Sequence, residues 1–241
     1  MKPFKSMRGY LFLWIWSMVI CSVLAGQSNS YIVSWLGIPV VDITVTIEPE
    51  DTVIQGIYTA KTRKWFDPIY AIDNRYNITC GTANYYPLNY AKQIIEKGNE
   101  SSFSAAYNIN DGLTDYSNGL QRTFPLGYYN LLSSLMWVER RNWMEGERHD
   151  IRVEIEGTLW HVALHCREII KQATGSTAEI EALFVTPVAG EPVLSHTDIV
   201  THRLPVVGNK MVFFIQLERK LIEVIEFGRP PFLVRATLVS S

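Results

Sequence analysis

Hydrophobic and polar residues alternate along most of the chain. In the clearest run, Val41, Ile43, Val45 and Ile47 are separated by Asp42, Thr44 and Thr46. A period of two is typical of a β-strand with one buried face. Similar runs recur between short segments rich in Gly, Pro, Asn and Asp, at spacings of roughly 8–14 residues. The pattern predicts an all-β, mainly antiparallel fold of about ten or more strands, which must curl or form a partly open barrel.

One segment, residues 124–143, has a helical period instead. Its apolar stripe consists of Tyr128, Leu131, Leu132, Leu135 and Val138. This spacing predicts one amphipathic helix from Tyr128 to Val138, and the stripe needs a sheet to lie against. Trp137 falls on the opposite face, where we expect it to be partly exposed or covered by a loop.

Four other segments carry weaker signals. Residues Tyr90 to Lys97 fit a short helix or a strand, and we favour a strand because a hairpin-type turn follows it. Gly56 is expected to mark a bulge or bend. Residues Asn110 to Arg122 are typical of a solvated loop leading to the helix. Residues Pro187 to Asp198 are the best candidate for a long loop, where ligand contacts are often found.

The first residues have the features of an export signal. Lys2, Lys5 and Arg8 precede an apolar run from Tyr10 to Ala25, which ends in small residues that fit a signal peptidase site. We therefore expect a signal peptide at residues 1–25, cleavage near Ala25, and a single β-rich domain at residues 26–241 in the periplasm. The alternative is an inner-membrane anchor formed by residues 10–25.

Charge argues against a nucleic-acid partner. Without residues 1–25 the chain has 19 Lys and Arg against 24 Asp and Glu, a formal charge of −5. A mildly acidic protein does not attract a polyanion through long-range electrostatics.

The cysteines and histidines offer little chemistry. Cys80 and Cys166 could form one disulfide after export, or both could be buried free thiols. His161 and His165 lie on a predicted strand, where four residues span about 13 Å, too far to share one zinc ion. His196 and His202, with Asp198, fit solvated surface better than a metal site. We predict no metal site and no cofactor.

No catalytic constellation can be named. The chain lacks a G-x-S-x-G elbow and a phosphate-binding glycine loop. Three carboxylate pairs occur, Glu145/Glu147, Glu154/Glu156 and Glu179/Glu181, and such pairs on strands or turns are usually solvated. The expectation is a protein that is not an enzyme.

Aromatic residues make up 12% of the chain and include seven tryptophans. Most must fill the core. Trp137, Trp65, Phe66 and Trp143 are candidates for ligand contact, and the alternative for each is ordinary packing.

Three parts of the sequence resemble a known family. They are YIVSWLGIPVVDITVTI at the start, LLSSLMWVER with the following HDIRVEIEGTLWHVALHCREII, and IEVIEFGRPPFLVRATLV at the end. In this order they resemble exported bacterial proteins of the domain of unknown function 3108 type. The resemblance implies a curled antiparallel sheet around one helix, and export. It supplies no catalytic residue.

Two functions follow as hypotheses. The first is an exported cell-envelope protein that binds or carries a lipid or other apolar or amphipathic ligand inside its sheet. The alternative is a structural or adaptor protein of the envelope that docks another protein through a sheet edge or the 187–198 loop.

Overall fold

The computed structural model describes residues 26–173, 175–194, 198, 201, 204–228 and 233–241. The expected signal peptide therefore lies outside the described residues. No helix in the described part is both long and apolar enough to cross a membrane.

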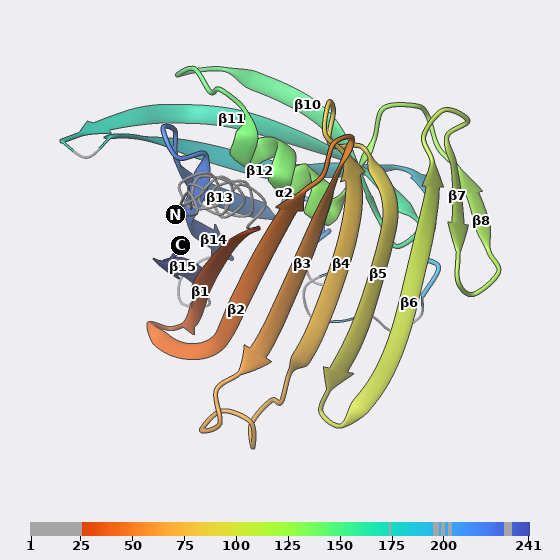
Figure 1. The fold of residues 1–241 in the computed structure, drawn as a ribbon, viewed down its shortest axis with the longest axis horizontal. Coiled ribbons are helices and arrows are strands. Elements are labelled where there is room, and N and C mark those ends of the chain that lie inside the picture. Colours follow the sequence, from red (N-terminus) through yellow and green to blue (C-terminus); the bar gives the residue numbers. More distant parts are fainter. Residues whose placement is uncertain (1–25, 174, 195–197, 199–200, 202–203, 229–232) are drawn as a thin grey trace, which may run out of the picture.

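The described chain forms one curled sheet around one short helix (Figure 1). Its strands are β1 Gln27–Trp35, β2 Ile38–Pro49, β3 Val53–Thr62, β4 Asp73–Gly81, β5 Pro87–Glu96, β6 Asn99–Asn108, β7 Leu113–Tyr116, β8 Gln121–Thr123, β9 Tyr129–Asn130, β10 Arg148–Ile155, β11 Thr158–Gln172, β12 Gly175–Gly190, β13 Lys210–Gln216, β14 Leu221–Phe227 and β15 Val234–Ser240. The helix is α2, Leu131–Arg140. These bounds confirm the predicted fold class.

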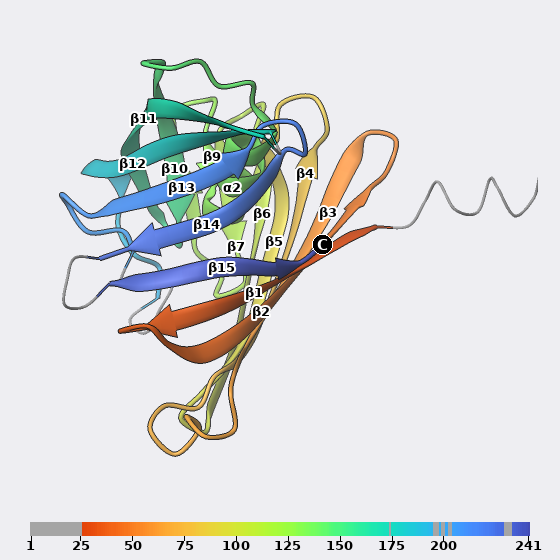
Figure 2. The same ribbon diagram turned by 90° about the vertical axis from the view of Figure 1, so that its left-hand side faces the viewer.

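The strand order shows how the sheet curls. It runs β8-β7-β6-β5-β4-β3-β2-β1-β15-β14-β13-β12-β11-β10-β9, and the described pairs are antiparallel except β9 with β10. Strand β1 pairs with the last strand, β15, so the first and last strands lie side by side in the middle of the sheet. The β2–β6 part forms one wall, and the β10–β15 part folds back over it (Figure 2). The sheet ends at β8 and β9 without closing.

Helix α2 begins at Leu131, three residues later than predicted. Asn130 is its N-cap: the Asn130 side chain accepts a hydrogen bond from the Leu132 N–H (3.0 Å), and Ser133 Oγ accepts one from the Asn130 N–H (3.0 Å). This reciprocal pair satisfies N–H groups that the first turn leaves free. Tyr128 comes before the helix and Tyr129 lies in β9.

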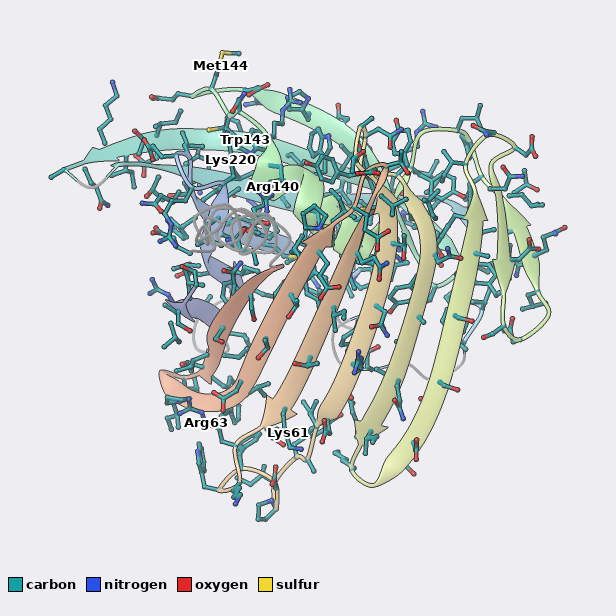
Figure 3. The ribbon with its side chains drawn as sticks, viewed as in Figure 1. Lys61, Arg63, Arg140, Trp143, Met144 and Lys220 are labelled. Carbon is teal, nitrogen blue, oxygen red and sulfur yellow. The ribbon has the colours of Figure 1, made fainter. Side chains whose placement is uncertain are left out.

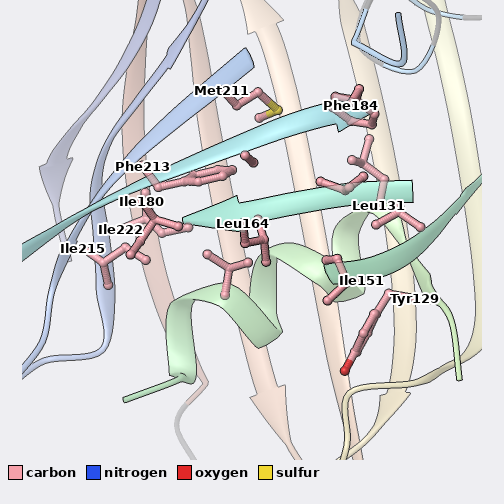
Figure 4. Packing of buried hydrophobic residues seen from close by; sticks show 14 of the residues in the cluster. Tyr129, Leu131, Ile151, Leu164, Ile180, Phe184, Met211, Phe213, Ile215 and Ile222 are labelled. Atoms are coloured by element: carbon pink, nitrogen blue, oxygen red, sulfur yellow. The ribbon is translucent and has the colours of Figure 1, made fainter. Parts of the chain in front are cut away.

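The helix is buried on nearly every side, because it lies between the two walls. Leu131 and Val138 pack with the strands of one wall, β10–β14, in the cluster that Figure 4 shows. Leu132 and Met136 pack with residues of β4–β7 on the other side. Ser133 and Ser134 are buried as well. The side opposite the predicted stripe is therefore covered at Ser133 and Ser134, whereas Trp137 is half-buried, as its expected partial exposure implied.

Long-range pairing also changed some local expectations. Residues Asn110 to Arg122 are not simply a loop, because they contain β7 and most of β8. The proposed loop at Pro187 to Asp198 begins later, since β12 continues to Gly190. Strand β5 confirms the choice made for residues 90–97. Strand β3 pairs regularly at Gly56, without a bulge.

Candidate functional site

Gly56 and Met136 identify the inner face of the sheet. A Cβ on Gly56 would lie 2.2 Å from Met136 Cε and 2.9 Å from Ile78 Cγ2, so the lack of a side chain at Gly56 leaves room for the helix to approach β3 closely. Ile47 of β2 lies directly opposite Gly56. Directly opposed residues point to the same side of a sheet, and side chains alternate along each strand. The register therefore shows which residues of the neighbouring strands face inward.

Most inward residues of five neighbouring strands are apolar or tyrosine, and Gln27 and Asn29 of β1 and Thr62 of β3 are polar exceptions. On β3, β2, β1, β15 and β14 the apolar and tyrosine residues include Tyr58, Ala60, Ile43, Val45, Val33, Val234, Ala236, Leu238, Ile225 and Phe227. We call these ten residues the inner wall. All ten are only half-buried, so the sheet presents an apolar inner surface that the chain itself covers incompletely. The opposite face of the same strands carries Asp42, Thr44, Arg235 and Thr237, all of them exposed.

Trp137 and Trp143, two predicted ligand contacts, meet near the end of α2. Their ring centroids lie 6.1 Å apart, and His149 packs edge-on against both. The guanidinium of Arg141 lies 5.0 Å from the centre of the Trp137 ring. This aromatic site already holds a cation from the same chain, which Glu147 fixes through a 2.8 Å ion pair. The neighbouring Arg141 and His149 lower the pKa of Glu147 to about 2.

Trp65 and Phe66, the other two candidates, lie far from the helix in the β3–β4 connection. The Phe66 ring contacts both Trp65 and Trp35, with centroids 5.4 Å and 6.5 Å away. Trp35 ends β1, so this contact joins two loops at the same end of the sheet. Trp65 is 52% exposed. The structure therefore brings the four candidates together as two separate pairs.

A buried polar seam joins the two walls where the sheet stays open. On one side of it, Glu154 of β10 is fully buried and accepts hydrogen bonds from Tyr107 and Tyr116 of β6 and β7, each 2.8 Å long. The Gly157 N–H donates a third bond, 2.7 Å long. Burial raises the pKa of the Glu154 carboxyl above its usual range, although these three hydrogen bonds act in the opposite direction.

Lys92 forms the second part of the seam. From β5, its ammonium group donates to Glu156 and to Asp198, the latter at 2.8 Å, and all three side chains are buried. Thr201 donates to Asp198 at 2.6 Å. Burial by itself would raise the pKa of Asp198, but the charge and hydrogen bond of Lys92, with the bonds from Thr201, outweigh it and lower that pKa.

The seam corrects a sequence interpretation. Glu154 and Glu156 were expected to be solvated, and that was wrong because β10 is covered by the opposite wall. The signal that could have found the seam is the position of Lys92. It lies between Tyr90 and Ile94 in the buried phase of its strand, where a cation requires a buried partner.

The remaining predicted positions are separate. Cys80 and Cys166 are free thiols in different clusters of the core, and burial raises the pKa of each to about 11. His161 bonds to Asp150 at 2.9 Å. His196 and His202 lie outside the described residues. Within the described part, no three His, Cys, Asp or Glu side chains are placed to share a metal ion.

Two hollows stand out among the described residues, and both open to solvent. One, of about 390 Å³, is lined by residues of β4–β7 that include Asn77, Asn89 and Asp115. The other, of about 230 Å³, lies beside Trp143 and Lys220. Trp65, Phe66 and Trp137 line neither of them.

Comparisons with known proteins bear on the fold of this chain and not on its function. No family model matches the chain, so the resemblance to the 3108 type is not confirmed, and no curated protein matches. A β-barrel-like protein of domain of unknown function 1849 from Brucella abortus has a TM-score of 0.58 and 7% identity, covering 90% of this chain and 97% of that one. A protein of the 1089 family of unknown function from Pseudomonas aeruginosa has a TM-score of 0.37 and 12% identity, over 79% and 90% of the two chains. The chain is thus similar in fold, over nearly its whole length, to a β-barrel-like domain of unknown function.

Proposed function

We propose that this is an exported, non-enzymatic protein of the cell envelope that binds an apolar or amphipathic ligand against its inner wall. Membership of the exported 3108-type family and a periplasmic location belong to the same proposal. The observation that carries it is the inner wall itself: its ten residues, on five adjacent strands, are apolar or tyrosine, and each keeps part of its surface accessible. A contiguous apolar surface that a folded chain leaves accessible is typical of a ligand-binding groove or another interaction site.

The other buried groups favour binding over catalysis. The seam is rich in ionisable side chains, but they face one another: Glu154 accepts three hydrogen bonds, and Lys92 bonds two carboxylates. A general acid or base needs a substrate within hydrogen-bond reach. Enclosed between the two walls, these groups are better suited to holding the curled sheet together.

The adaptor hypothesis ranks second. Both ends of the sheet are short strands, of three residues in β8 and two in β9. The part of β10 beyond β9, Arg148–Arg152, reads RHDIR, and charged residues on an edge oppose pairing with another chain. In the 187–198 loop, Asp198 is buried against Lys92. These features leave little edge for a partner strand.

A fluorescent fatty-acid analogue tests the proposal. We expect the purified protein to bind the probe, and the Ile43→Ser variant to bind it about tenfold more weakly, because a buried apolar contact is replaced by a hydroxyl. The control is Ile32→Ser. Ile32 is also half-buried, but it lies opposite Asp42 and so points to the outer face.

Equal affinity in both variants, or no binding by the parent protein, would contradict the proposal. Mass spectrometry of an organic extract from protein purified without detergent would identify the natural ligand. An apolar molecule in stoichiometric amount, lost from Ile43→Ser and retained by Ile32→Ser, is the expected result.

A further inference from the structure

Large apolar side chains are exposed together at one end of the molecule. They come from the β1–β2 turn and the β3–β4 connection, and they are Trp35, Leu36, Ile38, Trp65, Phe66 and Ile69. We call these six residues the tip patch. All but Phe66, which is half-buried, are exposed, from 39% for Trp35 to 65% for Ile69. The other described tryptophans are buried or half-buried, so both exposed ones lie here.

Folding does not account for Leu36. It is the first residue of a two-residue hairpin turn and has a φ of +52°, followed by Gly37 at +79°. Asn, Asp or Gly is strongly preferred at such a position, and a branched apolar residue is strained there. Burial also contributes little at Leu36, since it is 53% exposed. A strained and exposed leucine indicates a contact outside the chain.

The loop that carries Trp65 is held firmly. Arg63 forms an ion pair with Asp42 on β2, with an N–O distance of 2.7 Å. The Phe66 and Ile69 N–H groups close successive turns on the Arg63 and Phe66 carbonyls, each at 2.8 Å. Figure 3 shows Lys61 and Arg63 at this end of the sheet and Met144 at the opposite end. The aromatic side chains therefore project from an ordered support.

The size and composition of the patch fit a bilayer better than a protein. A stable protein interface uses about 20–30 residues a side, and the tip patch has six. Tryptophan is enriched where a protein meets the headgroup region, with leucine, isoleucine and phenylalanine reaching the acyl chains. Lys64 and Asp67 lie within the same loop and are both exposed, so charges of both signs accompany the apolar residues.

We propose that the tip patch inserts into the surface of a phospholipid bilayer. The strands that end at the patch, β1, β2 and β3, also carry much of the inner wall, so the patch places the wall beside a source of apolar ligand. This second step rests on the proposed function, whereas insertion of the tip does not. Insertion depends on the apolar side chains, in keeping with the acidic charge of the chain.

A fluorescent label tests insertion at a chosen position. An environment-sensitive dye is attached to Ile69→Cys, at the tip, or to Met144→Cys, at the far end. Met144 is 67% exposed, so the two sites match in accessibility. The protein is used without residues 1–25, which removes Cys21, and the remaining thiols, Cys80 and Cys166, are buried with a raised pKa and so react poorly with the dye. With phosphatidylcholine vesicles we expect a blue shift and quenching by brominated acyl chains for Ile69→Cys and neither for Met144→Cys.

Substitutions test which side chains are responsible. Leu36→Asn combined with Trp65→Ser should weaken vesicle binding of the tip label by at least about tenfold. The control Leu126→Asn removes an equally exposed leucine elsewhere and should leave binding unchanged. Adding phosphatidylglycerol or salt should have little effect.

Several results would overturn the proposal. They are the same dye response at both sites, no response at the tip, loss of binding in high salt, or a dimer in sedimentation that the double substitution dissociates. Binding of the soluble fatty-acid probe separates the two ideas: a protein whose tip fails to insert but which still binds the probe loses only this inference.

Discussion

At the scale of single residues, the seam shows that a buried carboxylate is tolerated when its oxygens are fully used. Glu154 has no exposed surface, and its two oxygens accept three hydrogen bonds. An unpaired carboxylate at such a site would be strongly destabilising. The raised pKa of Glu154 shows that burial still disfavours its charged form.

Glu154→Gln should therefore change how stability depends on pH. Folding raises the pKa of the Glu154 carboxyl, so the folded state keeps this proton to a higher pH than the unfolded state does. The contribution of Glu154 to the free energy of unfolding therefore falls as pH rises from the unfolded pKa, near 4.5, toward the folded pKa. Glutamine does not titrate, so the Glu154→Gln variant does not lose stability in this way as pH rises. Relative to the parent protein, it should become more stable between pH 4.5 and pH 7 in urea titrations.

Glu147→Gln is the matched control, with the opposite sign. Folding lowers the pKa of Glu147, so its contribution is present above the unfolded pKa and is lost as pH falls toward about 2. This variant should lose stability relative to the parent as pH rises from 2 to 5. Parallel curves for both variants would refute the assignment.

At the scale of elements, most turns and caps follow local rules, but five described residues other than glycine have a positive φ, and Leu36 is the apolar aliphatic one among them. The β5–β6 turn, Lys97-Gly98, has the same pair of positive φ values as Leu36-Gly37. In the first turn a flexible lysine lies over the Tyr70 ring, 4.4 Å from its centre. In the β1–β2 turn, the branched apolar side chain of Leu36 extends toward solvent, which indicates that this turn is not optimised for stability.

Leu36→Asn should stabilise the protein by about 0.5–1 kcal/mol, because asparagine adopts the left-handed conformation at lower cost. Thermal and urea unfolding measure this gain. Lys97→Asn is the comparison: it relieves a similar turn but loses the contact with Tyr70, so its gain should be smaller. A destabilised Leu36→Asn variant would show that Leu36 has a packing role in the fold.

At the scale of the whole molecule, the sheet is held in its curl by three connections. Helix α2 packs against both walls, β1 pairs with β15, and the seam joins β5–β7 to β10 through side chains. No backbone ladder joins β8 to β9 in the described sheet. The seam therefore substitutes for the missing strand pairing.

Removal of the seam's cation should loosen the whole fold. Lys92→Met leaves Glu156 and Asp198 without their buried counter-charge, which should cost about 3–5 kcal/mol in the free energy of unfolding. Lys210→Met, which removes a half-exposed partner of Glu181, should have a much smaller effect. Thiol reagents should reach both buried cysteines faster in Lys92→Met. Unchanged stability and labelling would show that the seam is not a structural latch.

The sequence by itself determined much of the local structure of this protein. Alternation along residues 40–47 predicted a strand, helical spacing predicted α2, and glycines predicted turns. These patterns succeed because the backbone conformation of a residue depends on its neighbours in the chain. Tertiary structure alone decided what those elements face. Glu154 was expected in water and is buried, and Trp65, a candidate ligand contact, is exposed in the β3–β4 connection. The physical reason is that burial depends on which distant strands cover a residue, and that pairing is not encoded within a few positions.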